Sequence, residues 1–387
     1  MRDSADFVII GGGVHGASLA FHLAKARAGS VLLLEKGHLA SGPTGKSGAM
    51  VRPLFNEAPY IRLVQRSTRM FEQWDQTVGG TAGWEQEGFL RISDQESERR
   101  FPADVTLMKE LGVPVEHLSV QDLRKAVPGG EFADGEFGMF LPEGGFADPI
   151  ITTHDLAGAA RRHGADIVEG AEVSSIETRR GRVQSVRTDQ GTVSTRTVVN
   201  CAGAWGDRVA AMVDVCLPIE VHRTPTVVFQ KPEGLRSGGP IISDAVNRVY
   251  WRNFCKEFLR IAHFGFTLDP ADPDAFDESV TWPQSLSLRA PLFRRMGVMR
   301  RALCTGGFSA LYDMTPDGHP IIGPSADAEG FWNNCGWSGN GFASAPALGE
   351  CLSRLILGDS CAIDLSLFGW PRSTPSVKRA EAAYVHE

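Results

Sequence analysis

The chain has 387 residues, of which 42% are hydrophobic and 22% are charged, a balance typical of a globular protein large enough for two domains. The formal net charge is −7 at pH 7 and there is no basic run, which argues against nucleic acid as a partner. No apolar stretch approaches the roughly 20 residues of a membrane-spanning helix. Because the first predicted strand begins close to the N-terminus, we also expect no signal peptide and a cytoplasmic location.

The N-terminus carries a strand followed by a glycine motif. Residues 7–10 are all apolar and predict a buried parallel strand, and the spacing G-x-G-x-x-G follows directly. In a dinucleotide site the three glycines permit a tight turn, a close approach to a pyrophosphate, and close packing of the next helix. The helix predicted for residues 14–28 would direct its first N–H groups at the phosphates. The predicted cradle consists of Gly11, Gly13, Val14, His15 and Gly16.

A second apolar strand, residues 31–34, ends at Glu35. That carboxylate lies about 20 residues beyond the glycines, where an acid normally binds ribose hydroxyls. Strand, glycines, helix, strand and acid in this order predict a dinucleotide site without deciding between FAD and NAD. We include the neighbouring Lys36 in the predicted site.

The loop at residues 41–52 is rich in small residues and has no apolar period. A flexible surface loop is one interpretation. We prefer a loop that contacts the ligand, because it follows the second strand and so leaves the carboxyl ends of the strands, where cofactors bind. Its predicted cofactor contacts are Ser41, Thr44, Gly45, Lys46, Ser47 and Gly48.

The middle of the chain alternates helices and short strands without a nucleotide motif, which is typical of a second domain. Strand-rich segments rich in β-branched and aromatic residues suit an antiparallel sheet in that domain. The predicted helices are 60–74, 96–111, 119–126, 149–163 and 280–293, and the predicted strand segments are 87–92, 137–141, 222–229 and 249–264.

In three later segments, small residues would let the backbone lie close to the predicted cofactor. Residues 198–205 are a buried strand that ends in small residues, and residues 317–323 are a turn that runs into a strand. Residues 331–342 are a strand and a glycine-rich turn, with a helix predicted for 344–357. The predicted cofactor contacts here, with one from an earlier strand, are Val173, Ala202, Gly203, Trp205, Gly323, Gly336, Gly339, Asn340, Gly341 and Phe342. The seven cysteines form no C-x-x-C pair, so we expect free thiols and no metal site.

Together these motifs resemble the FAD-dependent D-amino acid oxidase superfamily, in its sarcosine oxidase and glycine oxidase branch, over nearly the whole chain. The resemblance implies FAD rather than NAD. It implies an α/β (α+β) fold in which a Rossmann-like FAD-binding domain is joined to a discontinuous second domain, built on an antiparallel or mixed sheet flanked by helices. The implied FAD-binding domain covers 1–80, 149–215 and 318–387, and the implied substrate domain covers 81–148 and 216–317.

The resemblance further implies oxidation of the C–N bond of an amine or amino acid, such as a secondary amine or N-alkyl amino acid. Hydride passes to flavin N5 and an imine forms. Arg52 matches the family arginine that holds the substrate carboxylate, whereas Ala343 and Tyr312 stand where relatives place a further cation. Tyr250 and His263 lie on strands that face the flavin in relatives, with plain sheet packing as the alternative.

Departures from the family pattern leave several questions open. Ala310 and Lys46 replace residues that attach the flavin covalently in relatives, so we expect non-covalent FAD, with Cys304 as the remaining candidate for attachment. The lysine that speeds reaction with oxygen falls on Leu259 or Arg260, so the acceptor is oxygen or another oxidant. Two alternatives remain: a flavoprotein dehydrogenase of a 2-hydroxy acid or alcohol, and a non-catalytic FAD-binding subunit.

Overall fold

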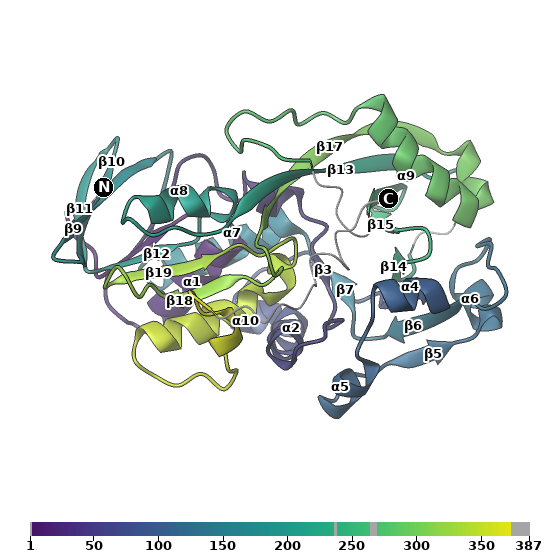
Figure 1. Cartoon of the computed structure of the whole chain (residues 1–387), viewed down its shortest axis with the longest axis horizontal. Helices are drawn as coiled ribbons and strands as arrows, with labels where there is room; N and C mark the ends of the chain where they lie inside the picture. The colour runs from purple at the N-terminus through teal and green to yellow at the C-terminus, as the bar shows by residue number, and fades with distance from the viewer. Residues whose placement is uncertain (1, 236–237, 264–268, 373–387) are drawn as a thin grey trace.

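The computed structural model describes residues 2–235, 238–263 and 269–372, and two large sheets dominate this part of the chain (Figure 1). The first sheet has the strand order β18-β19-β12-β1-β2-β8, and all its neighbours are parallel except the β18–β19 pair. Its strands are β1 (Phe7–Ile10), β2 (Val31–Glu35), β8 (Asp166–Glu169), β12 (Thr197–Asn200), β18 (Ile321–Pro324) and β19 (Phe331–Cys335).

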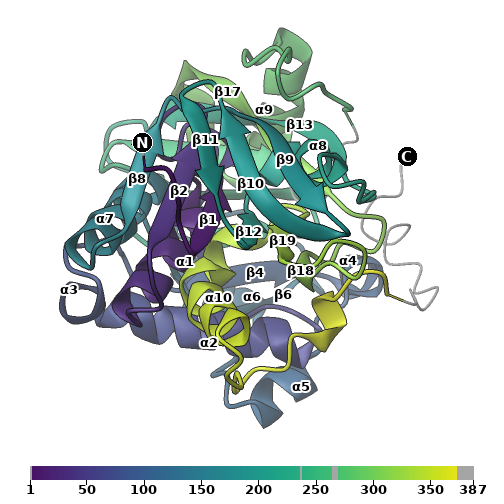
Figure 2. The same cartoon turned by 90° about the vertical axis from the view of Figure 1, so that its left-hand side faces the viewer.

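Both faces of the first sheet are covered, which explains why β1 and β2 are apolar at successive positions. Ile9 and Leu33 pack with the helices on one face. Val8 and Leu32 pack on the other face against a three-stranded sheet (Figure 2). The helices are α1 (Val14–Lys25), α2 (Ala58–Glu72), α7 (Pro149–Arg162) and α10 (Gly341–Ile356), and the small sheet consists of β9 (Val173–Arg179), β10 (Arg182–Thr188) and β11 (Gly191–Ser194).

The second large sheet has the order β17-β13-β16-β15-β14-β4-β6-β5 and is mixed, because β14 and β4 are parallel. Helix α9 (Trp282–Arg295) covers one face, where its Leu288 and Leu292 pack in a cluster with Phe229 and Ile261. The strands are β4 (Phe89–Ser93), β5 (Glu116–Leu118), β6 (Phe137–Leu141), β13 (Glu220–Gln230), β14 (Ile241–Asp244), β15 (Val249–Phe254), β16 (Phe258–His263) and β17 (Leu303–Met314).

Short elements complete the described chain. The pair β3 and β7 joins the loop after β2 to the segment before α7. No helix in the described ranges has the length and apolar character needed to cross a membrane. The remaining elements are β3 (Met50–Val51), β7 (Gly145–Phe146), α3 (Trp74–Thr77), α4 (Gln95–Arg100), α5 (Val105–Glu110), α6 (Val120–Ala126), α8 (Gly206–Ala211) and the 3-10 turns Pro43–Lys46, Gly203–Trp205, Gly297–Arg301 and Ser366–Phe368.

The predicted fold class is confirmed, and some element boundaries are corrected. The single helix predicted for 96–111 is wrong: α4 and α5 are separated at residues 101–104. Pro102 explains the break, because proline lacks an N–H and disfavours helical geometry at the preceding Phe101. The segment 249–264 contains a hairpin, β15 and β16, and α10 begins three residues earlier than predicted. The division into two domains stays a prediction.

Candidate active site

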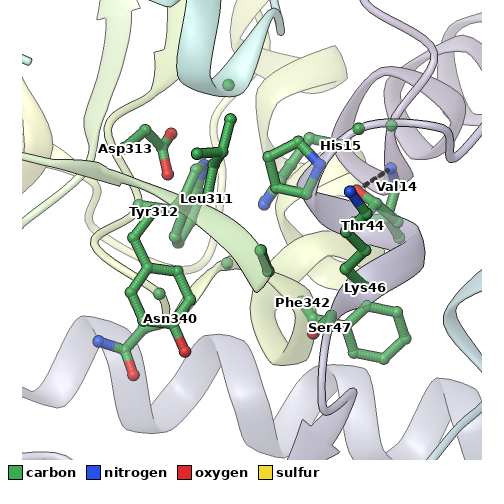
Figure 3. A pocket seen from close by; sticks show the side chains of 18 of the residues that line it. Val14, His15, Thr44, Lys46, Ser47, Leu311, Tyr312, Asp313, Asn340 and Phe342 are labelled. Atoms are coloured by element: carbon green, nitrogen blue, oxygen red, sulfur yellow. Dashed lines mark hydrogen bonds between the residues drawn. The ribbon is translucent and has the colours of Figure 1, made fainter. Parts of the chain in front are cut away.

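A cavity of about 990 Å³ lies at the carboxyl ends of β1, β2 and β12 and extends to the second large sheet. Residues from the glycine motif, the loop after β2, strands β15 to β17 and the start of α10 contribute to its wall. Figure 3 shows Thr44, His15, Tyr312 and Asn340, which come from four separate segments, on this wall. The site therefore depends on the whole fold rather than on one motif.

The glycine motif forms a close-fitting turn. Gly11 has φ +110°, and a Cβ on it would lie 2.4 Å from the Cys201 carbonyl oxygen. A Cβ on Gly13 would lie 2.9 Å from Thr44 Oγ1, which accepts a hydrogen bond from the Val14 N–H at 3.2 Å (Figure 3). Helix α1 has no side-chain cap and no acid in its first turn. Its positive dipole end is thus available to an anionic group in the cavity.

The Glu35 carboxylate lies on the same wall and is held by the backbone. Oε2 accepts the Gly12 N–H at 2.6 Å and Oε1 accepts the Gly37 N–H at 2.7 Å. An ionised carboxylate has about four acceptor positions, so two remain for hydroxyl donors of a ligand. This arrangement suits the ribose role predicted from the sequence.

His15 occupies the space between the starts of α1 and α10. Its ring stacks on Trp337 with centroids 4.3 Å apart, and Trp337 Nε1 donates to Asn334 Oδ1 at 3.0 Å. Neither ring nitrogen of His15 makes a well-aligned hydrogen bond within the described chain. Burial lowers the pKa of His15 to about 3, so the ring is neutral at pH 7. A polar ring buried without a partner is costly, and a polar ligand in the cavity would satisfy it.

Asp313 stabilises the turn before α10 by a hydrogen bond to its backbone. Its Oδ2 accepts the Gly336 N–H at 2.8 Å, and burial raises the pKa of Asp313 to about 6. Helix α10 also lacks a side-chain cap and an acidic residue in its first turn. Gly339, Asn340 and the first helical residue, Gly341, line the cavity at the start of this helix. Two uncapped helix starts therefore face the same cavity, which favours negative charge there.

A third part of the wall is closed by ion pairs. Lys36 Nζ lies 2.8 Å from Asp274 Oδ1 and 4.0 Å from the centre of the Trp205 ring. Trp205 Nε1 also donates to Asp274 Oδ1, at 2.7 Å, and Arg208 pairs with Asp272 and Asp274. These contacts join the loop after β2 to the segment that precedes α9.

Arg52, Tyr250 and Tyr312 share one region of the wall. Arg52 Nη2 donates to Asn340 Oδ1 at a long 3.4 Å, and its guanidinium lies over the rings of Phe55 and Phe89 at 5.3 and 5.8 Å. No carboxylate among the described residues lies within ion-pair distance of Arg52. Burial lowers the pKa of Arg52, although a guanidinium stays charged at pH 7. Arg52 is therefore a cation with capacity for an anionic ligand.

Tyr250 and Tyr312 complete this region, whereas His263 lies on the part of the cavity wall next to α9. Burial and a hydrogen bond with Tyr250 raise the pKa of Tyr312, so its hydroxyl is a neutral donor. His263 Nε2 lies 3.0 Å from Ser287 Oγ of α9, and burial lowers the pKa of His263. Both tyrosines and His263 line the cavity, as predicted from their strands.

Four of the predicted contact residues do not line the cavity: Gly16, Gly45, Gly323 and Gly336. Gly16 lies beneath the turn, where a Cβ would come within 1.9 Å of the Gly11 carbonyl oxygen. Gly45 similarly packs against the Ala40 carbonyl. These two serve close packing rather than ligand contact, and Gly336 serves the turn that Asp313 holds.

The structure also bears on two questions from the sequence: which residue could attach the flavin covalently, and which residue stands where relatives have the lysine that speeds reaction with oxygen. Ala310 and Lys46 lie on the cavity wall, and Lys46 Nζ is 2.5 Å from Glu278 Oε1. Cys304 is exposed on β17 and is not part of the wall. Arg260 lines the cavity, whereas Leu259 packs in the core on the other face of β16. The alternation of a strand decides between these adjacent residues.

Sequence reasoning missed several wall residues on β4, on β17 and directly after α4. Arg91 is 4% exposed and pairs with Glu98 at 3.6 Å, and Phe101 and Leu311 also reach the wall. The strand containing Arg91 was predicted, and the alternation around it was the available signal. Which face of that strand meets the cavity depends on the sheet as a whole, because either face of a strand can be the inner one.

The fold and this wall define a dinucleotide-binding oxidoreductase. The chain belongs to the family of FAD dependent oxidoreductases called DAO, whose model matches residues 6–355. FAD is thus its cofactor, and the glycine turn, the Glu35 carboxylate and the unpartnered His15 ring fit such a ligand.

Relatives and solved structures agree with this assignment. The chain is 27% identical to mitochondrial sarcosine dehydrogenase of Mus musculus, over 92% of this chain but 40% of that protein. It is 26% identical to sarcosine oxidase subunit beta of Rhizobium meliloti, over 91% of this chain and 84% of the subunit. Glycine oxidase from Geobacillus kaustophilus superposes with a TM-score of 0.84 at 25% identity, over 96% and 100% of the two chains. The chain thus spans about two fifths of the sarcosine dehydrogenase that it matches.

Proposed function

We propose that this chain oxidises the C–N bond of an amine or amino acid that carries a carboxylate. One observation carries the proposal: Arg52 is a cation on the cavity wall with no carboxylate partner in the described chain. The names of the relatives, which include sarcosine and glycine enzymes, support a small amino acid or N-alkyl amino acid as substrate. An arginine–carboxylate hydrogen bond contributes roughly 1.5–3 kcal/mol.

The wall residues would orient the substrate rather than react with it. Arg52 binds the carboxylate, and one hydroxyl of the hydrogen-bonded pair Tyr250 and Tyr312 donates a hydrogen bond beside it, because the other O–H is used within the pair. The neutral His263 adds no charge that would oppose binding of an amine. Bound FAD would supply the acceptor for the hydride, which carries both electrons away from the substrate carbon. No protein base is needed if the amine arrives uncharged, and the imine product then hydrolyses in water.

Finer features of the function are part of the same proposal. The electron acceptor is oxygen or another oxidant. Where relatives that react quickly with oxygen have a lysine on this strand, β16 carries Arg260, which contacts the loop after β2. We propose non-covalent FAD, no nucleic-acid partner and a cytoplasmic location. The net charge of −7 supports the absence of a nucleic-acid partner.

An anaerobic substrate panel tests the proposal. The FAD-loaded protein is mixed without oxygen with glycine, sarcosine, dimethylglycine, proline, and a matched set of 2-hydroxy acids and alcohols. We expect the amines to bleach the flavin absorbance and the hydroxy compounds to leave it unchanged. Bleaching by a 2-hydroxy acid alone would reassign the chain as an alcohol dehydrogenase. A spectrum that no compound changes would instead indicate a non-catalytic FAD-binding subunit.

A further inference from the structure

Two arginines stand directly opposite each other on β15 and β16 of the second sheet. Arg252 and Arg260 are register partners, and each is 5% exposed. Both side chains leave the sheet on the face away from α9 and reach the loop after β2, which belongs to the other half of the molecule. They form a direct polar link between the two halves, next to the Lys46–Glu278 ion pair.

The two arginines bind three successive carbonyl groups of that loop. Arg260 donates from Nη2 to the Lys46 oxygen at 3.0 Å and from Nη1 to the Ser47 oxygen at 2.7 Å. Arg252 donates from Nε to the Gly48 oxygen at 2.8 Å. Three charge-assisted bonds to consecutive peptides fix the orientation of the loop, which a single contact would not do.

These contacts direct one backbone donor. In a trans peptide the N–H points opposite to the preceding carbonyl, so the Gly48 N–H points away from Arg260. The neighbouring N–H groups are already used: Ser47 donates to the Thr44 oxygen and Ala49 to Ser47 Oγ, both at 3.0 Å. The Gly48 N–H has no partner in the described chain, and Gly48 lines the cavity. A Cβ on Gly48 would lie 3.8 Å from the Tyr250 ring, which places this donor beside the predicted substrate region.

The charge of the pair is only weakly compensated, because Glu85 and Asp148 act on Arg252 from beyond ion-pair distance. No carboxylate of the described residues forms an ion pair with Arg252 or Arg260, and carbonyls and the faces of Phe146 and Phe308 are their other contacts. Burial and the neighbouring Arg260 lower the pKa of Arg252 to about 9, which still leaves it charged at pH 7. Arg260 Nε is buried without a partner in the described chain. Buried cations of this kind call for negative charge nearby.

We propose that Arg252 and Arg260 are positioning residues for the flavin ring: they hold the loop so that the Gly48 N–H donates to the ring, and their charges favour negative charge on it. The proposal rests on the family's FAD and not on the identity of the substrate. It also assigns part of the coupling between the two halves of the molecule to these two side chains, beside the ion pairs of Lys36 and Lys46. Removing these hydrogen bonds should therefore change the affinity, spectrum and midpoint potential of bound FAD even when no substrate is present.

The test measures the flavin without turnover. Arg260→Gln, Arg252→Gln and Arg260→Lys are compared with wild type for FAD dissociation constant, absorbance spectrum and midpoint potential, with dithionite and reference dyes. The matched control is Arg223→Gln. Arg223 lies on β13 of the same sheet and donates to the Asp277 carbonyl oxygen at 3.0 Å, but it does not line the cavity.

Both glutamine variants should lower the midpoint potential and weaken FAD binding by at least about tenfold, the loss of one charge-assisted bond. Arg260→Lys should keep the wild-type potential, because the charge stays, but should weaken FAD binding, because an ammonium lacks the rigid planar fork that fixes the two carbonyls. Unchanged potential and affinity in both glutamine variants would overturn the proposal. Equal changes in Arg223→Gln would also overturn it, since general damage to the sheet would then explain them. If the glutamine variants do not fold, a wild-type FAD affinity in Arg260→Lys overturns it.

Discussion

At the scale of single residues, the dinucleotide site depends on backbone donors and a few acceptors. Glu35 illustrates this, because both of its oxygens are oriented by N–H groups of the turns beside it. The orientation is prepared before the ligand binds, which lowers the entropic cost of binding. The same carboxylate is then available to the ribose hydroxyls.

Replacing Glu35 tests this role. Glu35→Ala should weaken FAD binding by at least about tenfold, because two charge-assisted bonds to the ribose are lost. Glu169→Ala is a matched control: Glu169 is the register partner of Glu35 on β8 and also accepts a backbone N–H, from Leu39 at 2.9 Å, but it does not line the cavity. The measurement is fluorescence titration of the FAD-free protein. Equal affinities in the two variants would mean that the ribose lies elsewhere.

The sequence predicts residues of this kind well, because the glycine motif and the acid lie within one βαβ unit of fixed geometry. It also selected Arg52, Tyr250 and His263, all of which reach the cavity wall. It left Leu259 and Arg260 undecided, since a strand's inner face is set by its sheet partners. The unpartnered ring of His15 was likewise invisible, because it requires the stack on Trp337.

At the scale of elements, two helices begin at the cavity without side-chain caps, α1 and α10. The sequence predicted both helices, but it placed the start of α10 at Ser344 rather than Gly341 because small residues carry little helical signal. It missed β17, whose Gly306 and Gly307 break the usual strand composition. The carboxylate of Asp313, at the end of β17, ties this strand to the turn before α10.

Asp313 should give this turn a distinct pH dependence. Burial raises the pKa of Asp313 to about 6 in the folded state, above roughly 3.9 in the unfolded chain. The folded state thus binds the proton more tightly, so stability is lost as pH rises from about 4 to about 6. The upper limit of this loss is roughly 2–3 kcal/mol.

Urea unfolding at a fixed FAD concentration between pH 4 and pH 7 measures the effect. The free energy of unfolding of wild type should fall relative to Asp313→Asn across this range and then run parallel to it above about pH 6.5. Asparagine keeps an acceptor for the Gly336 N–H, so the fold should persist. Parallel profiles over the entire range would contradict a raised pKa of the buried Asp313 carboxyl.

At the scale of the whole molecule, the cavity exists because two sheets from interleaved parts of the chain face each other. The resemblance to a known family predicted the mixed α/β fold class, which the structure and its solved neighbours confirm, whereas the domain bounds stay a prediction. Composition and periodicity alone would not have predicted the strand order of the second sheet. In that sheet β4, β5 and β6 lie beside the later strands β13 to β17, so its strands come from more than half of the chain. Such long-range pairing has no local signal.

The architecture predicts that FAD is released intact by unfolding. Ala310 occupies the position of a possible attachment cysteine, Lys46 is paired with Glu278, and Cys304 lies off the cavity wall. Acid precipitation of the yellow protein should therefore leave the colour in the supernatant. Colour retained in the pellet would show a covalent bond, and mass spectrometry of the labelled peptide would then identify the residue.

The central claim, that the cavity oxidises a carboxylated amine anchored by Arg52, is tested most directly by a two-by-two comparison. Anaerobic flavin reduction is measured for wild type and Arg52→Ala, each with the best amino acid substrate and with its primary amide. We predict that Arg52→Ala keeps bound FAD and lowers the second-order rate constant for the acid by roughly 10- to 200-fold, the cost of one charge-assisted bond, but hardly changes that for the amide. Arg52→Lys should restore part of the loss, because it keeps the charge without the two-pronged geometry. An equal loss for acid and amide, or normal reduction of Arg52→Ala by the acid, would contradict the account.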